Sequence, residues 1–169
     1  MRKWEDLPEF MKCDEVKEYY NILSRKKVSL ILKRGFDLVA GVGVLVVTAI
    51  PMLVIGIKIA TESEGGVFYR QERVTIYGKK FKIHKFRTMV ANADKIGSAV
   101  TVSGDNRITP TGAFLRKYRL DELPQVFDIL SGNMSFVGTR PEVVKYVKKY
   151  NQNILQHCYY LRELPLKQV

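Results

Sequence analysis

The chain has 169 residues, enough for one domain, and 28 Lys and Arg against 17 Asp and Glu give it a net charge of +11. Its two cysteines, Cys13 and Cys158, lie far apart, which excludes a disulfide framework and a zinc site of paired cysteines. The basic balance indicates an anionic partner, such as acidic lipid headgroups or phosphorylated substrates. Nucleic acid is not expected as a partner, because no known nucleic-acid-binding motif is present.

Residues 1–32 are predicted to form an N-terminal amphipathic or interfacial segment. Between residues 9 and 32, apolar side chains recur at spacings of three and four, which is typical of a helix with one apolar face. Such a helix would lie on a bilayer surface or pack on the rest of the domain, and the pattern leaves both alternatives open.

Residues 33–60 are predicted to anchor the chain in a membrane. The uncharged run from Leu38 to Ile57 has about 20 residues, the length that crosses a hydrocarbon core. Pro51 removes a backbone N–H inside this run and predicts a bend or break there. Lys and Arg residues flank both ends, and such residues favour the cytoplasmic side. Length alone favours a single spanning helix, whereas the flanks favour a re-entrant helix-break-helix.

Residues 61–155 are predicted to form a small cytoplasmic catalytic domain with short helices and a few strands. Residues 66–89 alternate aromatic or branched residues with basic ones, which predicts two strands joined by a turn at Tyr77-Gly78. A loop is expected over 91–112, because this stretch is rich in Gly, Ser, Thr, Asn and Asp. With the apolar segment, these elements predict an α+β fold.

Three helices are expected in the second half of this domain. The first is short and runs over 112–118. The second begins near Leu123-Pro124, since proline is favoured at the first helical position, and ends at Ser131-Gly132. Pro141 is expected to open the third.

Asp121 and Glu122 stand side by side in the block RKYRLDELPQ, just before a predicted helix start. A helix N-terminus suits a phosphate, and adjacent basic residues such as Arg116 keep a carboxylate ionised. A carboxylate beside a bound phosphate needs a divalent cation for screening. The block therefore fits a phosphoryl-transfer site with a carboxylate nucleophile. Taken alone, the block is a weak signal, because acidic residues near helix starts are usually caps or solvated charges.

Two further basic clusters are candidate phosphate-binding sites. Strand alternation in KIHKFRTM would place Lys85 and Arg87 on one face, and Arg140 in SFVGTRPE offers a guanidinium fork for phosphate oxygens. The alternative for each is a solvated surface, and His84 is most simply a polar strand residue.

These segments together resemble one known family. KR-x-x-D, a proline-broken apolar segment, FYRQER, GKKFKIHKFRTM, DNRITPTGAFLRKYRLDELPQ and GNMSFVGTRPE occur in the order of the bacterial sugar transferases, the small monotopic phosphoglycosyl transferases. The resemblance covers about residues 33–150. It implies a domain on the cytoplasmic face of the membrane that moves a phospho-sugar from a UDP-sugar to polyprenyl (undecaprenyl) phosphate.

By this resemblance Asp121 is the nucleophile that releases UMP, and Glu122 is its partner in the dyad and helps to hold Mg²⁺. Basic positions that match the family's and suit the diphosphate are Lys85, Arg116 and Arg140. Pro51 matches the helix-breaking position, although Ile50 stands where a serine is frequent. A homodimer is compatible with the sequence.

The tail, residues 156–169, departs from the family, whose members continue with an apolar segment containing Pro-Ala-Gly-Val-Thr or a similar motif. Read one base back, codons that encode Gln156 to Val169 permit Ala-Thr-Leu-Leu-Leu-Pro-Ala-Gly-Val-Thr-Ser-Glu-Ala-Ser. We therefore expect the tail to be out-of-frame translation, with a naturally divergent short tail as the alternative. A truncated, inactive relative is accordingly the alternative function.

Overall fold

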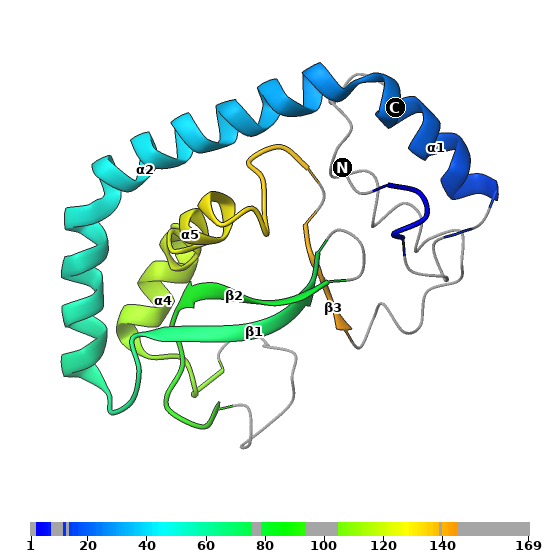
Figure 1. Cartoon of the computed structure of the whole chain (residues 1–169). Coiled ribbons are helices and arrows are strands. Elements are labelled where there is room, and N and C mark those ends of the chain that lie inside the picture. The colour runs from blue at the N-terminus through cyan, green and yellow to red at the C-terminus, as the bar shows by residue number, and fades with distance from the viewer. Residues whose placement is uncertain are drawn as a thin grey trace.

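The computed structural model describes residues 3–7, 12, 14–75, 79–93, 105–138 and 140–144, and the statements below concern these. The molecule is a small antiparallel sheet with short helices beside it, and a long helix passes along its outside (Figure 1). This arrangement agrees with the predicted α+β fold.

The sheet has the strand order β2-β1-β3, so β2 lies at one edge. Strands β1 (Phe68–Val74) and β2 (Lys80–Phe86) pair from Phe68↔Phe86 to Val74↔Lys80, which confirms the two strands predicted over 66–89. The predicted turn at Tyr77-Gly78 lies outside the described residues.

The short strand β3 (Glu142–Val143) pairs antiparallel with β1 at Arg73 and Val74. The helix predicted from Pro141 is therefore wrong at its start, because residues 142 and 143 take up the free edge of β1. Val144 is helical, and the remainder of that predicted helix lies outside the described residues.

Helix α1 (Asp14–Arg25) lies within the predicted amphipathic segment, and one of its faces is packed. Val16 is buried, and the ring of Tyr20 meets Trp4 edge-on at a centroid distance of 5.2 Å. Trp4 belongs to the same N-terminal segment, so both alternatives, a helix on a bilayer surface and a helix packed on the rest of the domain, stay open.

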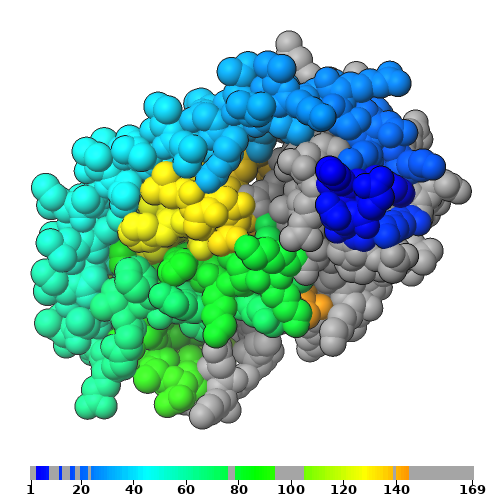
Figure 2. Space-filling view, in the orientation of Figure 1, coloured from blue at the N-terminus to red at the C-terminus, as the bar shows by residue number. Residues whose placement is uncertain are grey.

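Helix α2 (Lys27–Glu62) contains the whole apolar run and extends beyond both predicted ends. Only 6 % of its most apolar stretch is buried, whereas the core helix of a soluble protein is mostly covered. At 1.5 Å per residue the helix is about 54 Å long, well beyond a hydrocarbon core of about 30 Å. Figure 2 shows its side chains, coloured blue to cyan, along the outer border of the molecule.

Pro51 lies inside α2, and the helix continues through it. The predicted break is therefore wrong, because one missing N–H and one displaced carbonyl are absorbed without ending the helix. The alternative of a bend agrees with the shape of the helix, which runs along one side of the domain and then turns down beside the sheet (Figure 1).

Charged side chains hold α2 to the domain at two places, which we call joints. One lies on the part of the helix before the bend, its first arm, and the other at the end of the part after the bend, its second arm. In the first joint, Arg34 donates to the carbonyls of Ile129 and Leu130 at 2.7 and 2.8 Å, at the end of α5 (Gln125–Leu130). Nearby, the buried Asp37 accepts the Phe136 N–H at 3.1 Å. The KR-x-x-D motif is thus what fastens the first arm.

In the second joint, Arg87 donates to the carbonyls of Ser63 and Glu64 at 2.7 and 2.8 Å, just after the end of α2. Glu62 accepts the Thr111 N–H at 3.0 Å, in the first turn of α4 (Pro110–Lys117). These bonds satisfy groups that a helix leaves open at its ends.

The core lies between the second arm of α2, the strands and α4. Ile59, Phe86 and Leu115 form a buried cluster, against which Met52, Ile55, Val67, Leu120 and Leu123 pack. Gly112 lets α4 approach β2 closely, because a Cβ atom there would overlap the Thr88 carbonyl oxygen. Leu120 and Leu123 bring the segment between α4 and α5 onto this core.

Candidate functional site

The site is built on the turn between α4 and α5, both of which were predicted. Helix α4 ends at Lys117, and Arg119 takes a left-handed conformation with φ of 59°. The chain then forms a single 3-10 turn, η3 (Leu120–Glu122), before Pro124 and α5. Left-handed backbone is unusual outside glycine, and it redirects the chain here so that Leu120 packs inward and Asp121 and Glu122 follow at once.

Glu122 is held by two cations that come from distant parts of the sequence. The Glu122 carboxylate oxygen Oε1 accepts from Lys85 Nζ at 2.9 Å and from an Arg140 guanidinium nitrogen at 2.6 Å. Burial by itself would raise the pKa of Glu122, but these two hydrogen bonds outweigh it and the pKa is lowered. Glu122 is therefore an ionised group with a fixed position.

Asp121 differs from its neighbour. Its Oδ1 atom is buried and has no hydrogen-bond partner among the residues that the structure describes. Burial raises the pKa of the Asp121 carboxyl, Lys85 acts in the opposite direction, and the Glu122 carboxylate adds to the increase. A partly desolvated carboxylate oxygen without a donor is open to react with, or bind, an incoming group.

Three of the four predicted phosphate-binding residues lie around this dyad. Lys85 and Arg140 contact Glu122 directly. Arg116 lowers the pKa of Asp121 electrostatically, and its Nε atom donates to Thr88 Oγ1 at 2.9 Å. The structure thus brings together side chains from β2, α4, η3 and the segment before β3.

Arg87 lies apart from this group. It is buried, and its guanidinium fills the joint at the end of α2, where it donates to backbone carbonyls and to Ser63 Oγ. The prediction that Lys85 and Arg87 share a strand face does not hold, because β2 ends at Phe86 and Arg87 lies beyond it. Arg87 therefore contributes to the architecture of the anchor.

Gln125 and Arg73 were not among the site residues predicted from the sequence. Gln125 Nε2 is buried without a hydrogen-bond partner among the described residues, which makes it an open donor four residues after Asp121. Arg73 is half-buried and donates to the Pro141 carbonyl at 3.1 Å. Burial lowers the pKa of Arg73, and the nearby Arg140 adds to that effect. Both residues lie in motifs noted above, LDELPQ and FYRQER, but spacing alone gives no reason to choose them.

His84 and Asp128 form a second contact between β2 and the η3–α5 segment. The buried Asp128 carboxylate accepts the His84 backbone N–H at 2.8 Å and contacts ring atom Nδ1 at 2.9 Å. Because Lys85 binds Glu122, two successive residues of β2 are held by two carboxylates six residues apart. His84 is thus a polar strand residue, as its simplest interpretation predicts, and its partner fixes the strand that carries Lys85.

The two carboxylates of the dyad suit a magnesium ion in donor type. Mg²⁺ takes oxygen ligands, usually one or two protein carboxylates completed by water and substrate phosphates. The unpaired Oδ1 of Asp121 is a free oxygen of this kind. No group of three acidic, histidine or cysteine side chains suited to a metal occurs in the described part of the chain, so substrate phosphates would complete the shell.

Comparisons with known proteins point to one family. Residues 28–165 match the family described as "Bacterial sugar transferase". The chain is 42 % identical over 127 residues to a putative undecaprenyl-phosphate N-acetylgalactosaminyl 1-phosphate transferase of Bacillus subtilis, which covers 74 % of this chain and 70 % of that protein. The match to the family reaches into the tail, which lies outside the described residues, so the out-of-frame interpretation stays a prediction.

Longer relatives match over the same part of the chain. A UDP-N-acetylgalactosamine-undecaprenyl-phosphate N-acetylgalactosaminephosphotransferase of Aeromonas hydrophila is 38 % identical over 128 residues, 76 % of this chain and 30 % of that protein. A UDP-glucose:undecaprenyl-phosphate glucose-1-phosphate transferase of Klebsiella pneumoniae is 39 % identical over 129 residues, 75 % of this chain and 27 % of that protein. The chain thus spans less than a third of the length of these two relatives.

Proposed function

The chain belongs to the bacterial sugar transferase family, and we propose that it transfers a phospho-sugar from a UDP-sugar to polyprenyl phosphate with Asp121 as nucleophile. The observation that carries the proposal is the contrast within the dyad. Glu122 is held by Lys85 and Arg140, whereas the adjacent Asp121 has a buried oxygen without a partner.

In the first half-reaction, a carboxylate oxygen of Asp121 attacks the phosphorus next to the sugar. A new oxygen–phosphorus bond forms, the bond to the bridging oxygen breaks, and UMP leaves with that oxygen. Lys85, Arg116 and Arg140 are close enough to the dyad to offset the negative charge of the diphosphate and of the departing UMP.

In the second half-reaction, an oxygen of polyprenyl phosphate attacks the same phosphorus. The bond to Asp121 breaks, the carboxylate is restored, and the product is a polyprenyl diphosphate sugar. No water is consumed, so the site must keep water from the acyl phosphate, and the partial burial of Asp121 supports this.

Asp121 and Glu122 would hold Mg²⁺ with the substrate phosphates, and the ion would stabilise negative charge on the phosphoryl oxygens. Gln125 offers a further donor for a phosphate or sugar oxygen, since its amide nitrogen has no partner among the described residues.

The proposal includes a re-entrant arrangement of α2 with the domain on the cytoplasmic face. Both arms of α2 contact one domain, through Arg34 and Asp37 on the first arm and Glu62 at the end of the second. A straight spanning helix would separate these contacts by a bilayer, so the two joints support a helix that enters and leaves on the same side.

Topology is tested with single cysteines at Lys26 and Glu64, placed in a background without Cys13 and Cys158. Both should react with a membrane-impermeant thiol reagent from the cytoplasmic side alone. Labelling of the two positions from opposite sides would contradict the re-entrant arrangement.

The reaction is tested with the protein in lipid, Mg²⁺ and a panel of UDP-sugars, with UMP release as the measurement. Without acceptor we expect about one UMP per enzyme with the right sugar, and continued release when polyprenyl phosphate is added. Asp121→Asn should release none. A folded protein that binds a UDP-sugar and releases no UMP would contradict the proposed function.

A further inference from the structure

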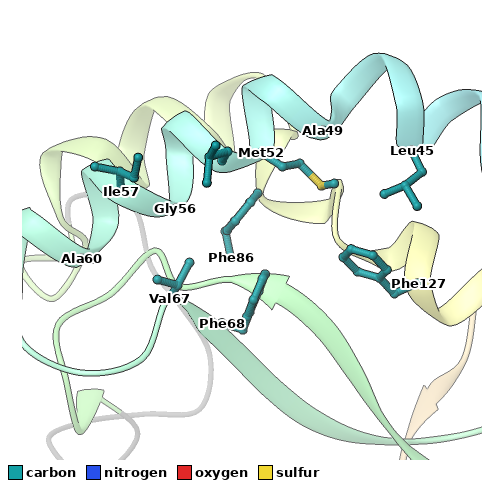
Figure 3. Close-up of a pocket in the computed structure, with 11 residues that line it drawn as sticks. Leu45, Ala49, Met52, Gly56, Ile57, Ala60, Val67, Phe68, Phe86 and Phe127 are labelled. Atoms are coloured by element: carbon teal, nitrogen blue, oxygen red, sulfur yellow. The ribbon is translucent and has the colours of Figure 1, made fainter.

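An apolar cavity of about 530 Å³ lies between the inner side of α2 and the sheet. Figure 3 shows Leu45, Met52 and Gly56 of α2 on one side, Phe68 and Phe86 of the strands on another, and Phe127 of α5 at one end. The bend in α2 lets one helix cover this space from above.

The lining of the cavity selects for hydrocarbon. Each of the described side chains that line it is apolar, and the glycine among them adds no polar side chain. A void of this size has room for many water molecules but gives them no side-chain partners, and such cavities favour apolar occupants. Its volume lies within the range of ligand sites in proteins.

The cavity lies between the proposed membrane segment and the core that supports the dyad. Its roof is the apolar helix, whose other side exposes Val46, Val47 and Ile50 by more than 70 % of their surface. Its floor includes Phe86, which belongs to the buried core cluster. Leu120 and Leu123, the residues on either side of the dyad, pack against this cluster. An apolar chain that enters from the bilayer would thus lie against the back of the site.

We propose that this cavity binds the first part of the isoprenoid chain of the polyprenyl phosphate acceptor, an inference that rests on the proposed function. The acceptor is the one substrate with a long hydrocarbon chain, and its phosphate must reach Asp121 while its chain stays out of water. The cavity lining includes Phe86, on whose cluster Leu120 and Leu123 pack, so a chain held there would stay out of water next to the core that supports the dyad.

Two glycines of α2 provide a matched pair of variants. A side chain at Gly56 would lie beside Val67, another residue that lines the cavity, with its Cβ atom 3.5 Å from Val67 Cγ1, an ordinary contact distance. Gly43 meets nothing within 4 Å on the same helix. Gly56→Leu therefore fills the cavity, and Gly43→Leu makes the same change of residue in open space.

The experiment uses the protein in phospholipid vesicles with a photoreactive polyprenyl phosphate, and peptide mapping locates the cross-links. The expected result is labelling of peptides that contain Phe68 or Phe127, reduced about tenfold in Gly56→Leu and unchanged in Gly43→Leu. The KM for a long-chain acceptor should rise by a similar factor in Gly56→Leu, whereas a water-soluble acceptor with one isoprene unit should show no difference between the variants.

Three results would overturn the inference: equal labelling of both variants, labelling that an excess of unmodified polyprenyl phosphate does not reduce, and cross-links between two copies of the chain. The second would identify the occupant as bulk lipid, and the third as another protein molecule. Labelling of the cavity without any UMP release would leave this site standing and refute the proposed reaction, so the two failures are distinct.

Discussion

Buried carboxylates occur in two regions of the molecule. One region consists of the contacts that hold α2 and β2 in place, and the other is the dyad on η3. The two regions differ in whether the carboxylate oxygens have hydrogen-bond partners. Asp37 and Asp128 are buried, and each accepts a backbone N–H from a distant segment. Asp121 has a buried oxygen with no partner among the described residues. Asp37 and Asp128 thus use their oxygens to hold parts of the fold together, whereas Asp121 keeps one oxygen available.

Two basic residues of one motif also serve these two different regions. Lys85 and Arg87 are two positions apart, yet the Lys85 ammonium faces the dyad and the Arg87 guanidinium closes the end of α2. The Arg87 guanidinium holds the end of α2, although its Nε atom has no partner among the described residues, whereas the Lys85 ammonium fixes Glu122 in the site. Stability and activity should therefore respond in opposite ways to changes in the two regions.

The largest loss of stability is expected from Asp128→Ala. It leaves the His84 N–H and ring without their acceptor and places a void beside β2, so the free energy of unfolding should fall by about 3 kcal/mol. Thermal unfolding in lipid nanodiscs measures this. Asp128→Asn keeps one carbonyl oxygen for the His84 N–H, so its free energy of unfolding should fall by less than half as much. Equal losses in the two variants would show that the hydrogen bonds are not the cause.

A smaller loss is expected from Arg87→Met, which removes the donors to Ser63 and Glu64 but keeps the apolar stem. The free energy of unfolding should fall by about 2 kcal/mol. Lys85→Met, two residues earlier, should lower it by about 1 kcal/mol, since Arg140 still binds Glu122, but should suppress UMP release at least tenfold. If Lys85→Met unfolds the protein as readily as Arg87→Met, the division between joint and site is wrong.

Asp121→Asn should go the other way and raise the free energy of unfolding by about 1 kcal/mol at neutral pH while it abolishes UMP release. The substitution keeps the shape of the side chain and removes a partly buried charge whose pKa is raised by burial. Glu122→Gln is the matched substitution at the neighbouring residue. It breaks two ion pairs and should not stabilise the protein. A loss of stability in Asp121→Asn would show that its carboxylate is held after all.

Much of this division was predictable, and the failures have physical causes. The family resemblance of their motifs singled out the dyad, Lys85, Arg116 and Arg140, and the structure brings Lys85 and Arg140 into contact with Glu122. Arg87 has the same chemistry as Lys85, and its role depends on where β2 ends, which no spacing reveals.

The continuation of α2 through Pro51 and the partners of Asp128 were not predicted, for a related reason. A proline weakens a helix by a fixed amount, but whether the helix ends there depends on what supports its second arm, here the joint made by Glu62 and Arg87. In the sequence, nothing distinguishes Asp128 from the other residues of QVFDIL. Its two contacts with His84 join residues that are 44 positions apart. Contacts between distant segments are set by tertiary packing, which a single sequence does not display.

The smallest and sharpest effect concerns pH. Because burial raises the pKa of Asp121 in the fold, folding favours the protonated carboxyl relative to the unfolded chain. That contribution to stability is complete below the unfolded pKa, about 3.9, and is lost as the pH rises through the folded value. The advantage of Asp121→Asn over the unmodified protein should therefore be present at pH 7 and shrink toward zero near pH 4. Thermal unfolding of both proteins across this range measures the difference. An advantage that grows on acidification would mean that the fold favours the ionised carboxylate and that Asp121 belongs with the joints.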